Sequence, residues 1–213
     1  MSGTAEPGIL LVDKPPGPSS HDIVARARRE RGMKAGHAGT LDPFASGLLV
    51  VLLGREATRL QARFMALPKS YLAVARFGAV STTGDPDGEI TNTGRMPPPE
   101  LELPTGALRQ RPPAYSAVKV GGVRAYRRAR RGESVEVPER EVTVHRFVER
   151  WREGDRAAFE IECSSGTYVR SLIADLGDAY TEELRRTAIG RFSVEEAGIF
   201  LPLADALLRL PAP

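Results

Sequence analysis

Cysteine is nearly absent from this chain of 213 residues, which contains only Cys163. One cysteine cannot form an internal disulfide, and a chain of this length can bury a sizeable hydrophobic core without one. The three histidines, His21, His37 and His145, lie far apart in the sequence. Zinc motifs need histidines and cysteines at short, regular spacings, so we expect no bound metal.

Other familiar motifs are missing as well. No run of about 18 apolar residues suggests a transmembrane helix. The first residues, "MSGTAEPGILLVDKP", lack the basic segment that begins a signal peptide. The sequence has no phosphate-binding glycine loop, dinucleotide-binding motif or nucleophile elbow. The missing motifs argue against a hydrolase and a nucleotide-binding fold. Because a single cysteine fits a reducing cytoplasm, we expect a cytoplasmic protein that has no membrane partner.

Acidic residues are absent from positions 109–131, although eight of the 30 basic residues lie there. The remaining 22 basic residues are outnumbered by 27 acidic ones, so this segment carries the positive character of the chain. A concentrated basic segment is typical of proteins that bind a polyanion, although a solvated helix face would also explain it. Tyr115 and Tyr126 lie among the basic residues, and aromatic rings stack on unpaired bases. The segment therefore favours RNA as the partner.

Hydrophobic patterns predict strands over residues 9–12 and over "GLLVVLLG", "SYLAVARFG" and "AAFEIECSSG". A helix is expected over "SSHDIVARARRERG", with Ser20 as its N-cap and Gly32 at its end, and a second over "GTYVRSLIADLGDAY". A short helix should begin after the loop "MPPPELELP". This irregular mixture predicts an α+β fold with a mixed, largely antiparallel sheet.

The chain shows no repeat and no clear linker, so we expect one domain over residues 1–200. An irregular excursion at about 110–145, with a helical piece near 124–131, would be its RNA-binding insertion. Residues 201–213 would form a short amphipathic tail.

Asp42 lies in the stretch "GHAGTLDPFASGLLVVLLG", with no other acid within eight residues on either side. Pro43 directs the aspartate away from helical geometry. Gly36, Gly39 and Gly47 allow another backbone or a ligand to approach closely. The local pattern leaves two interpretations open: a turn in which Asp42 caps an amide, or a loop that presents one acid to a large substrate.

Five blocks in order resemble the TruB family of tRNA pseudouridine synthases over roughly residues 8–191. They are "GILLVDKPPGPSS", "GHAGTLDPFASGLLVVLLGREATRL", "KSYLAVARFGAVSTTGDPDGEI", "PPAYSAVKVGGVRAYRRARRG" and "CSSGTYVRSLIADLG". The resemblance implies the pseudouridine synthase fold, in which helices and loops surround an active-site cleft. It also implies isomerisation of the T-loop uridine at position 55 of tRNA, without a cofactor or a metal.

The same resemblance assigns roles to individual residues. Asp42 would be the catalytic aspartate, Tyr71 the aromatic residue that stacks on the target base, and Arg170 the partner of the aspartate. His37 would occupy space in the T-loop when the base leaves its stack. The remaining expected RNA contacts are Lys14, Lys119, Arg124, Tyr126, Arg128, Arg130 and Tyr168.

The expected reaction breaks the bond between ribose C1′ and uracil N1, rotates the base and joins C1′ to C5. An ionised carboxylate can act as nucleophile or base, and a neighbouring arginine lowers its pKa. The sequence leaves open whether Asp42 attacks C1′, attacks C6 or removes a ribose proton.

Most bacterial members of the family continue into a C-terminal RNA-binding domain, which we expect to be absent or vestigial here. We therefore expect a monomer that binds the T-loop and stem of tRNA and needs no guide RNA. Two alternatives stay open: an RNA-binding or RNA-chaperone module without chemistry, and a synthase that acts on a different RNA.

Overall fold

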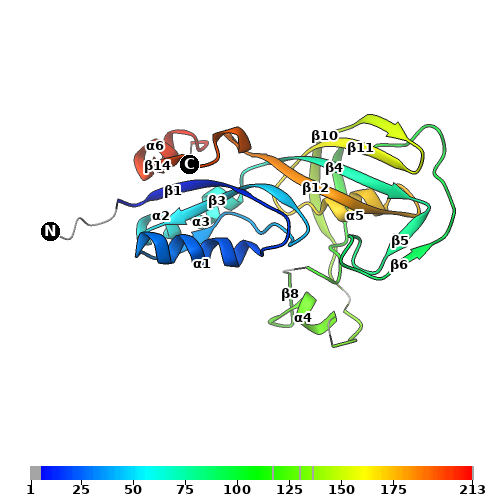
Figure 1. Cartoon of the computed structure of the whole chain (residues 1–213), viewed down its shortest axis with the longest axis horizontal. Coiled ribbons are helices and arrows are strands. Elements are labelled where there is room, and N and C mark those ends of the chain that lie inside the picture. The colour runs from blue at the N-terminus through cyan, green and yellow to red at the C-terminus, as the bar shows by residue number, and fades with distance from the viewer. Residues whose placement is uncertain (1–5, 117, 130, 136, 213) are drawn as a thin grey trace. The chain divides into compact units, whose positions relative to one another are not determined.

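The computed structural model describes residues 6–116, 118–129, 131–135 and 137–212 (Figure 1). The chain forms two compact units. The first, unit 1, contains everything up to Tyr71 together with the segment from Leu184 onward, and unit 2 is Leu72–Glu183. The boundaries between the units fall within two strands, β4 (Lys69–Phe77) and β12 (Ala179–Ile189).

Strand pairing produces a mixed sheet in the order β14-β1-β3-β12-β4-β11-β10-β7, with β2 beside β3 and β13 beside β12. β12 runs parallel to β3, through Arg185 opposite Ser46 and Arg186 opposite Gly47. The other pairs whose register is known are antiparallel, for example β1 with β3 and β10 with β11. The expected α+β fold with a mixed, largely antiparallel sheet is confirmed.

Unit 1 contains the strands that surround the Asp42 segment. Its elements are β1 (Gly8–Lys14), α1 (Ser20–Arg31), β2 (Ala35–His37), β3 (Ser46–Leu53), α2 (Arg55–Arg59), α3 (Gln61–Met65), β13 (Phe192–Ser193), the 3-10 helix η1 (Val194–Glu196), β14 (Phe200–Pro202) and α6 (Leu203–Leu208). The strands predicted near residues 9–12 and 47–54 are therefore confirmed.

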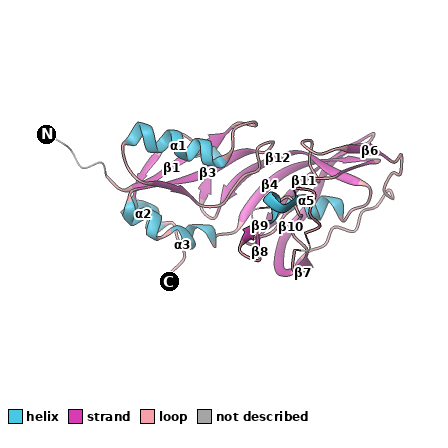
Figure 2. Ribbon diagram, turned by 90° about the horizontal axis from the view of Figure 1, so that it is seen from below, coloured by secondary structure: helices cyan, strands magenta, loops and turns pink. Residues whose placement is uncertain are grey.

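The apolar run of β3 is buried on both faces, which explains why it lacks alternation. Leu49, Val51 and Leu53 pack with residues of α1, whereas Leu48 and Val50 pack with Phe64 of α3 and with α6. In Figure 2, α1 lies on one side of β1 and β3, and α2 and α3 lie on the other. Because both faces are covered, β3 is a rigid support for the loop that precedes it.

Unit 2 is built around a long hairpin of β10 (Arg140–Glu153) and β11 (Arg156–Cys163), beside which β7 (Gly106–Gln110) pairs with β10. Its other elements are β5 (Ala79–Ser81), β6 (Ile90–Asn92), β8 (Lys119–Val120), β9 (Val123–Arg124), α4 (Ala125–Ala129) and α5 (Val169–Ala174). The predicted strand ending at Cys163 and the helical piece near 124–131 are both confirmed.

Two local expectations were wrong. Ser19, not Ser20, caps α1, because its side chain accepts from the Asp22 backbone while Asp22 bonds back to Ser19. Ser20 is instead buried inside the first turn. The helix expected after the proline-rich loop does not form, and β7 begins there at Gly106. In the part of the chain that the structure describes, no helix is both long and apolar enough to cross a membrane.

Candidate functional site

The backbone of the loop that carries Asp42 is hydrogen-bonded on both sides of the aspartate. Ser20 Oγ donates to Leu41 O at 3.0 Å and accepts from Leu41 N at 2.8 Å. Asp42 O accepts from Ala45 N, and Pro43 O accepts from Gly17 N at 2.8 Å. The aspartate therefore lies in an ordered turn, partly exposed, directly before β3.

Arg186 lies under this loop, and sequence reasoning missed it. Its side chain is 1% exposed, and its Nε donates to Leu48 O at 2.8 Å. Its Nη1 and Nη2 donate to Thr40 O at 3.4 Å and Gly39 O at 3.1 Å. In the sequence, Arg186 looks like one more charged residue of "ELRRTA", far along the chain from its loop partners. The small residues around Asp42 were the one sequence feature that indicated a large neighbouring group at this loop.

Lys14 also lies next to the Asp42 loop, where it contacts Pro43. Its side chain is fully buried, and its ammonium donates to the carbonyls of Pro15, Pro18 and Pro43. Burial lowers the pKa of Lys14, the nearby Asp42 carboxylate opposes this shift, and Arg186 adds to it. The expected contact of Lys14 with RNA stays a prediction, and in the structure its ammonium binds carbonyls of the loop.

The glycines around Asp42 have specific neighbours. A Cβ on Gly47 would lie 2.2 Å from Arg186 O, so only glycine lets β3 approach β12 this closely. A Cβ on Gly39 would lie 3.6 Å from Arg186 Nη1 and 4.0 Å from Lys69 Cε. Lys69 is itself buried and donates to Met65 O and Leu67 O. Thus Gly47 makes room for a second backbone, whereas a Cβ on Gly39 would touch two buried cations at ordinary contact distance, and the φ of +100° at Gly39 favours glycine.

Two further predicted residues lie in unit 1. Tyr71, in β4, is 9% exposed, and His37, in β2, is partly exposed. The His37 carbonyl accepts from Gln61 Nε2 at 2.8 Å, which links β2 to α3. Their roles toward a substrate stay predictions.

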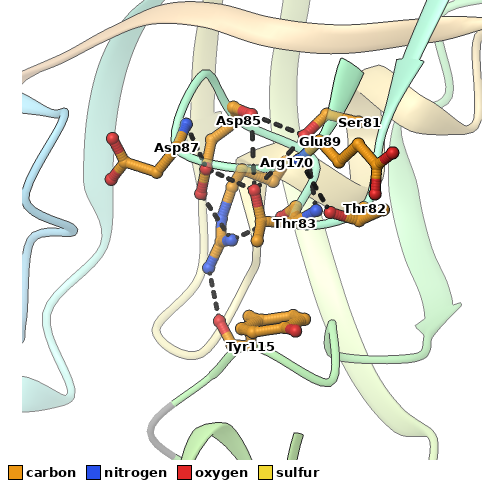
Figure 3. A network of polar contacts seen from close by, with 8 residues as sticks. All are labelled: Ser81, Thr82, Thr83, Asp85, Asp87, Glu89, Tyr115 and Arg170. Atoms are coloured by element: carbon orange, nitrogen blue, oxygen red, sulfur yellow. Dashed lines mark hydrogen bonds and ion pairs between the residues drawn. The ribbon is translucent and has the colours of Figure 1, made fainter. Parts of the chain in front are cut away.

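Arg170, at the start of α5 in unit 2, forms a buried ion pair with Asp85. Its Nη1 donates to Asp85 Oδ2 at 2.8 Å and to Thr83 O at 2.6 Å, and the two side chains are 4% and 6% exposed. Its Nη2 donates to Tyr115 O at 2.8 Å. Figure 3 shows the guanidinium between the turn 81–89 and Tyr115. Asp42 belongs to unit 1, so its predicted pairing with Arg170 stays a prediction.

Tyr168 directly precedes α5 and is fixed at its backbone. Gln110 Nε2 donates to Tyr168 O at 3.0 Å, while Tyr168 N donates to Gln110 Oε1 at 2.7 Å. The Arg140 guanidinium lies 4.9 Å from the centre of the Tyr168 ring. An aromatic ring held this firmly can serve as a stacking platform.

The predicted RNA-binding insertion is only partly described. Arg130 lies outside the described residues, as do the side chains of Lys119, Arg124 and Tyr126. Although residues 109–131 contain no acid, Arg128 has an acidic partner, because its Nε lies 2.7 Å from Glu133 Oε2. Glu133 lies just beyond the acid-free segment 109–131, and the chain turns back at Arg131 and Gly132 to bring it close.

Within the described ranges, no group of three histidine, cysteine, aspartate or glutamate side chains could hold a metal ion. What the Asp42 loop offers chemically is one carboxylate among buried cations, which favours the ionised form. This suits a nucleophile or a base.

Comparison with known proteins places these features in a family. Residues 26–169 match the family described as "TruB family pseudouridylate synthase (N terminal domain)". "tRNA pseudouridine synthase B" of Thermobifida fusca (strain YX) is 44% identical over 227 residues, which cover 96% of this chain and 76% of that protein. The protein of the same name from Mycobacterium bovis (strain BCG / Pasteur 1173P2) is 42% identical over 224 residues, covering 96% and 74%.

Two solved structures share the fold. "Crystal Structure of a Cbf5-Nop10-Gar1 Complex" matches with a TM-score of 0.64 and 33% identity, covering 87% of this chain and 50% of that chain. "Structure of H/ACA RNP bound to a substrate RNA containing 2'-deoxyuridine" matches with a TM-score of 0.61 and 30% identity, covering 87% and 48%. The chain thus spans about half the length of these two structural relatives.

Proposed function

The chain belongs to the TruB family of pseudouridylate synthases, and we propose that it isomerises a uridine of tRNA to pseudouridine. The observation that carries the proposal is the ordered Asp42 loop, in a chain that is 44% identical over almost its full length to a tRNA pseudouridine synthase B. The substrate site is proposed to be the T-loop uridine at position 55.

Asp42 is the proposed catalytic residue. Lys14 lies close enough to Asp42 for the carboxylate to affect its pKa, and Arg186 binds the backbone two and three residues before Asp42. Both cations stabilise the carboxylate form, which either nucleophilic attack or proton removal requires.

The reaction is an internal exchange of bonds. The C1′–N1 bond breaks, the uracil turns, and C1′ bonds to C5. The hydrogen of C5 leaves as a proton and N1 gains one, so atoms and electrons balance without a cofactor. Asp42 attack on C1′, attack on C6 and removal of a ribose proton all fit this balance.

The target base must leave its stack to reach Asp42, which costs a few kcal/mol. Tyr71 is proposed to stack on the flipped base, and stacking contributes about 1–3 kcal/mol per base. Arg170 is proposed to pair with Asp42 during the reaction, and His37 to fill space in the T-loop. Tyr168 and the basic insertion are proposed to contact the RNA.

We propose that the protein acts as a monomer in the cytoplasm and selects tRNA without a guide RNA. The proposal rests on its likeness to the synthase B proteins, which match 96% of the chain. The two solved relatives are named as parts of larger complexes, and the chain spans only about half of their length.

Incubation with an unmodified tRNA transcript, followed by chemical mapping of pseudouridine, tests the proposal. We expect one new pseudouridine, at position 55, and none in a transcript that carries cytidine there. Tight tRNA binding without any product would favour an RNA-binding or RNA-chaperone module. Product in another RNA but not in tRNA would indicate a different substrate.

A further inference from the structure

Arg186 is a buried cation whose side chain donates to the backbone on both sides of Asp42. Its three carbonyl partners are Gly39 and Thr40 before the aspartate and Leu48 after it. Burying a guanidinium is costly unless its donors are satisfied, and these carbonyls accept from Nε, Nη1 and Nη2. The arginine and the loop therefore stabilise each other.

Arg186 is also fixed by its own backbone. It pairs with Gly47 in the parallel β3–β12 ladder, and Gly47 has a φ of +103°, with no room for a Cβ against Arg186 O. The side chain thus starts from a rigid strand and ends on the loop. The position of β12 therefore fixes the position of the backbone that precedes Asp42.

Comparison with Arg185 shows that only the arginine at position 186 of this pair binds the loop backbone. Arg185 is on the same strand, but its guanidinium forms a two-point ion pair with Asp13 and is 39% exposed. Arg185 also donates to Ser46 Oγ, a side chain at the start of β3. Because successive side chains of a strand point to opposite faces, Arg185 lies at the surface whereas Arg186 binds the loop backbone.

We propose that Arg186 is a positioning residue for the reaction: it sets the orientation of the Asp42 loop and supplies positive charge beneath it. This inference rests on the proposed function, because it assigns a task toward Asp42. A carboxylate that must come within bonding distance of a nucleotide is sensitive to its placement, and a displacement of 1 Å can cost about 100-fold in rate. Lys14 of β1 and Lys69 of β4 also lie close to the loop.

The test compares Arg186→Lys and Arg186→Met with the control Arg185→Lys. For each, the single-turnover rate constant at saturating tRNA, the fraction of active enzyme, the tRNA Kd and the pH–rate profile are measured. Lysine keeps the positive charge but lacks the planar guanidinium that donates to three separate carbonyls. Methionine removes both the charge and these hydrogen bonds. We expect the rate constant to fall at least about tenfold for Arg186→Lys and about 100-fold for Arg186→Met, with tRNA Kd unchanged.

The pH–rate profile separates positioning from charge. Loss of a nearby cation raises the pKa of a carboxylate, so the acid limb should move to higher pH in Arg186→Met and stay in place in Arg186→Lys. If Arg186→Met fails to fold, the rate constant of Arg186→Lys still decides the matter. A purely structural arginine would lower the active fraction but leave the rate constant and the pH profile as in the parent, and this result would overturn the inference.

The parent enzyme distinguishes this inference from the proposed function. If the parent forms no pseudouridine in tRNA, the proposed function fails. If the parent is active and both Arg186 variants keep its rate constant within about twofold, only the positioning role fails.

Discussion

At the scale of single residues, Gly47 and Gly17 form a natural matched pair. Their φ angles are +103° and +105°, so a side chain would strain the backbone similarly at both positions. Their surroundings differ, because a Cβ on Gly47 would meet Arg186 O at 2.2 Å, whereas a Cβ on Gly17 would meet nothing within 4 Å. Gly47 therefore has two reasons to be glycine and Gly17 has one.

We predict that Gly17→Ala lowers the free energy of unfolding by about 1–3 kcal/mol, the cost of an unfavourable φ. Gly47→Ala should cost about 1–3 kcal/mol more, because the methyl group forces β3 and β12 apart. Chemical denaturation of both variants measures the difference. Equal losses would mean that the close approach of the two strands has no energetic weight.

The residues around Asp42 show how much of the site could be predicted from the sequence. The glycines around Asp42 correctly indicated that something approaches closely there. They could not indicate which group approaches, because Arg186 contacts the loop only in the folded chain and looks in the sequence like one more charged residue of "ELRRTA". Lys14 shows the same limit: the sequence places a lysine before two prolines, and only the structure shows that its ammonium donates to three carbonyls.

At the scale of elements, prediction succeeded where burial imposes a repeating pattern. β11 alternates buried and exposed residues, and β3 has a solid apolar run, so both were found from the sequence. β2 and β14 have only three residues each, too few for any period to appear. The N-cap of α1 was misplaced by one residue because two serines are adjacent, and the hydrogen bond that Asp22 N donates to Ser19 Oγ distinguishes them.

The turn 81–89 and α5 are joined by the Arg170–Asp85 pair, whose members are both almost fully buried. We predict that Arg170→Ala lowers the free energy of unfolding by about 3–5 kcal/mol, because it leaves a buried carboxylate without its cation. The double variant Arg170→Met with Asp85→Leu should recover a large part of this loss, since no charge then stays buried.

Denaturation of Arg170→Met, Asp85→Leu and the double variant that combines them gives the coupling between the two residues. Arg95→Ala is the control, because Arg95 is 76% exposed where it meets Asp178 and should cost at most about 1 kcal/mol. Additive losses for Arg170 and Asp85 would show that the pair does not join the turn to the helix.

At the scale of the whole molecule, positive charge is concentrated in the insertion, while many arginines elsewhere are paired with acids. On the β10–β11 hairpin, Arg146 and Arg150 lie near Glu160, and Arg156 pairs with Glu182. In the insertion, Arg128 also has an acidic partner, and Arg127 and Arg131 are exposed. An arginine that is already paired with a carboxylate neutralises less phosphate charge, so its binding to RNA releases fewer counterions.

We predict that replacing Arg124, Arg127 and Arg131 with glutamine lowers tRNA affinity. The slope of log affinity against log salt should flatten by about 0.7–0.9 for each phosphate that the variant no longer neutralises. The single-turnover rate at saturating tRNA should change much less, because Asp42 is untouched. The control replaces Arg146, Arg150 and Arg156 with glutamine, which removes the same formal charge from the β10–β11 hairpin. Equal slopes for the two triple variants would place the RNA-binding surface outside the insertion.

The Asp42→Asn variant tests the central claim most directly, because the amide keeps the shape of the aspartate and removes the charge that the chemistry needs. Parent and variant are each incubated in excess with unmodified tRNA transcript, and pseudouridine is measured in a single turnover. We predict no product from Asp42→Asn, with tRNA binding within about tenfold of the parent because phosphate contacts dominate affinity. Product from the variant at a rate near that of the parent would contradict the assignment of Asp42 as the catalytic residue.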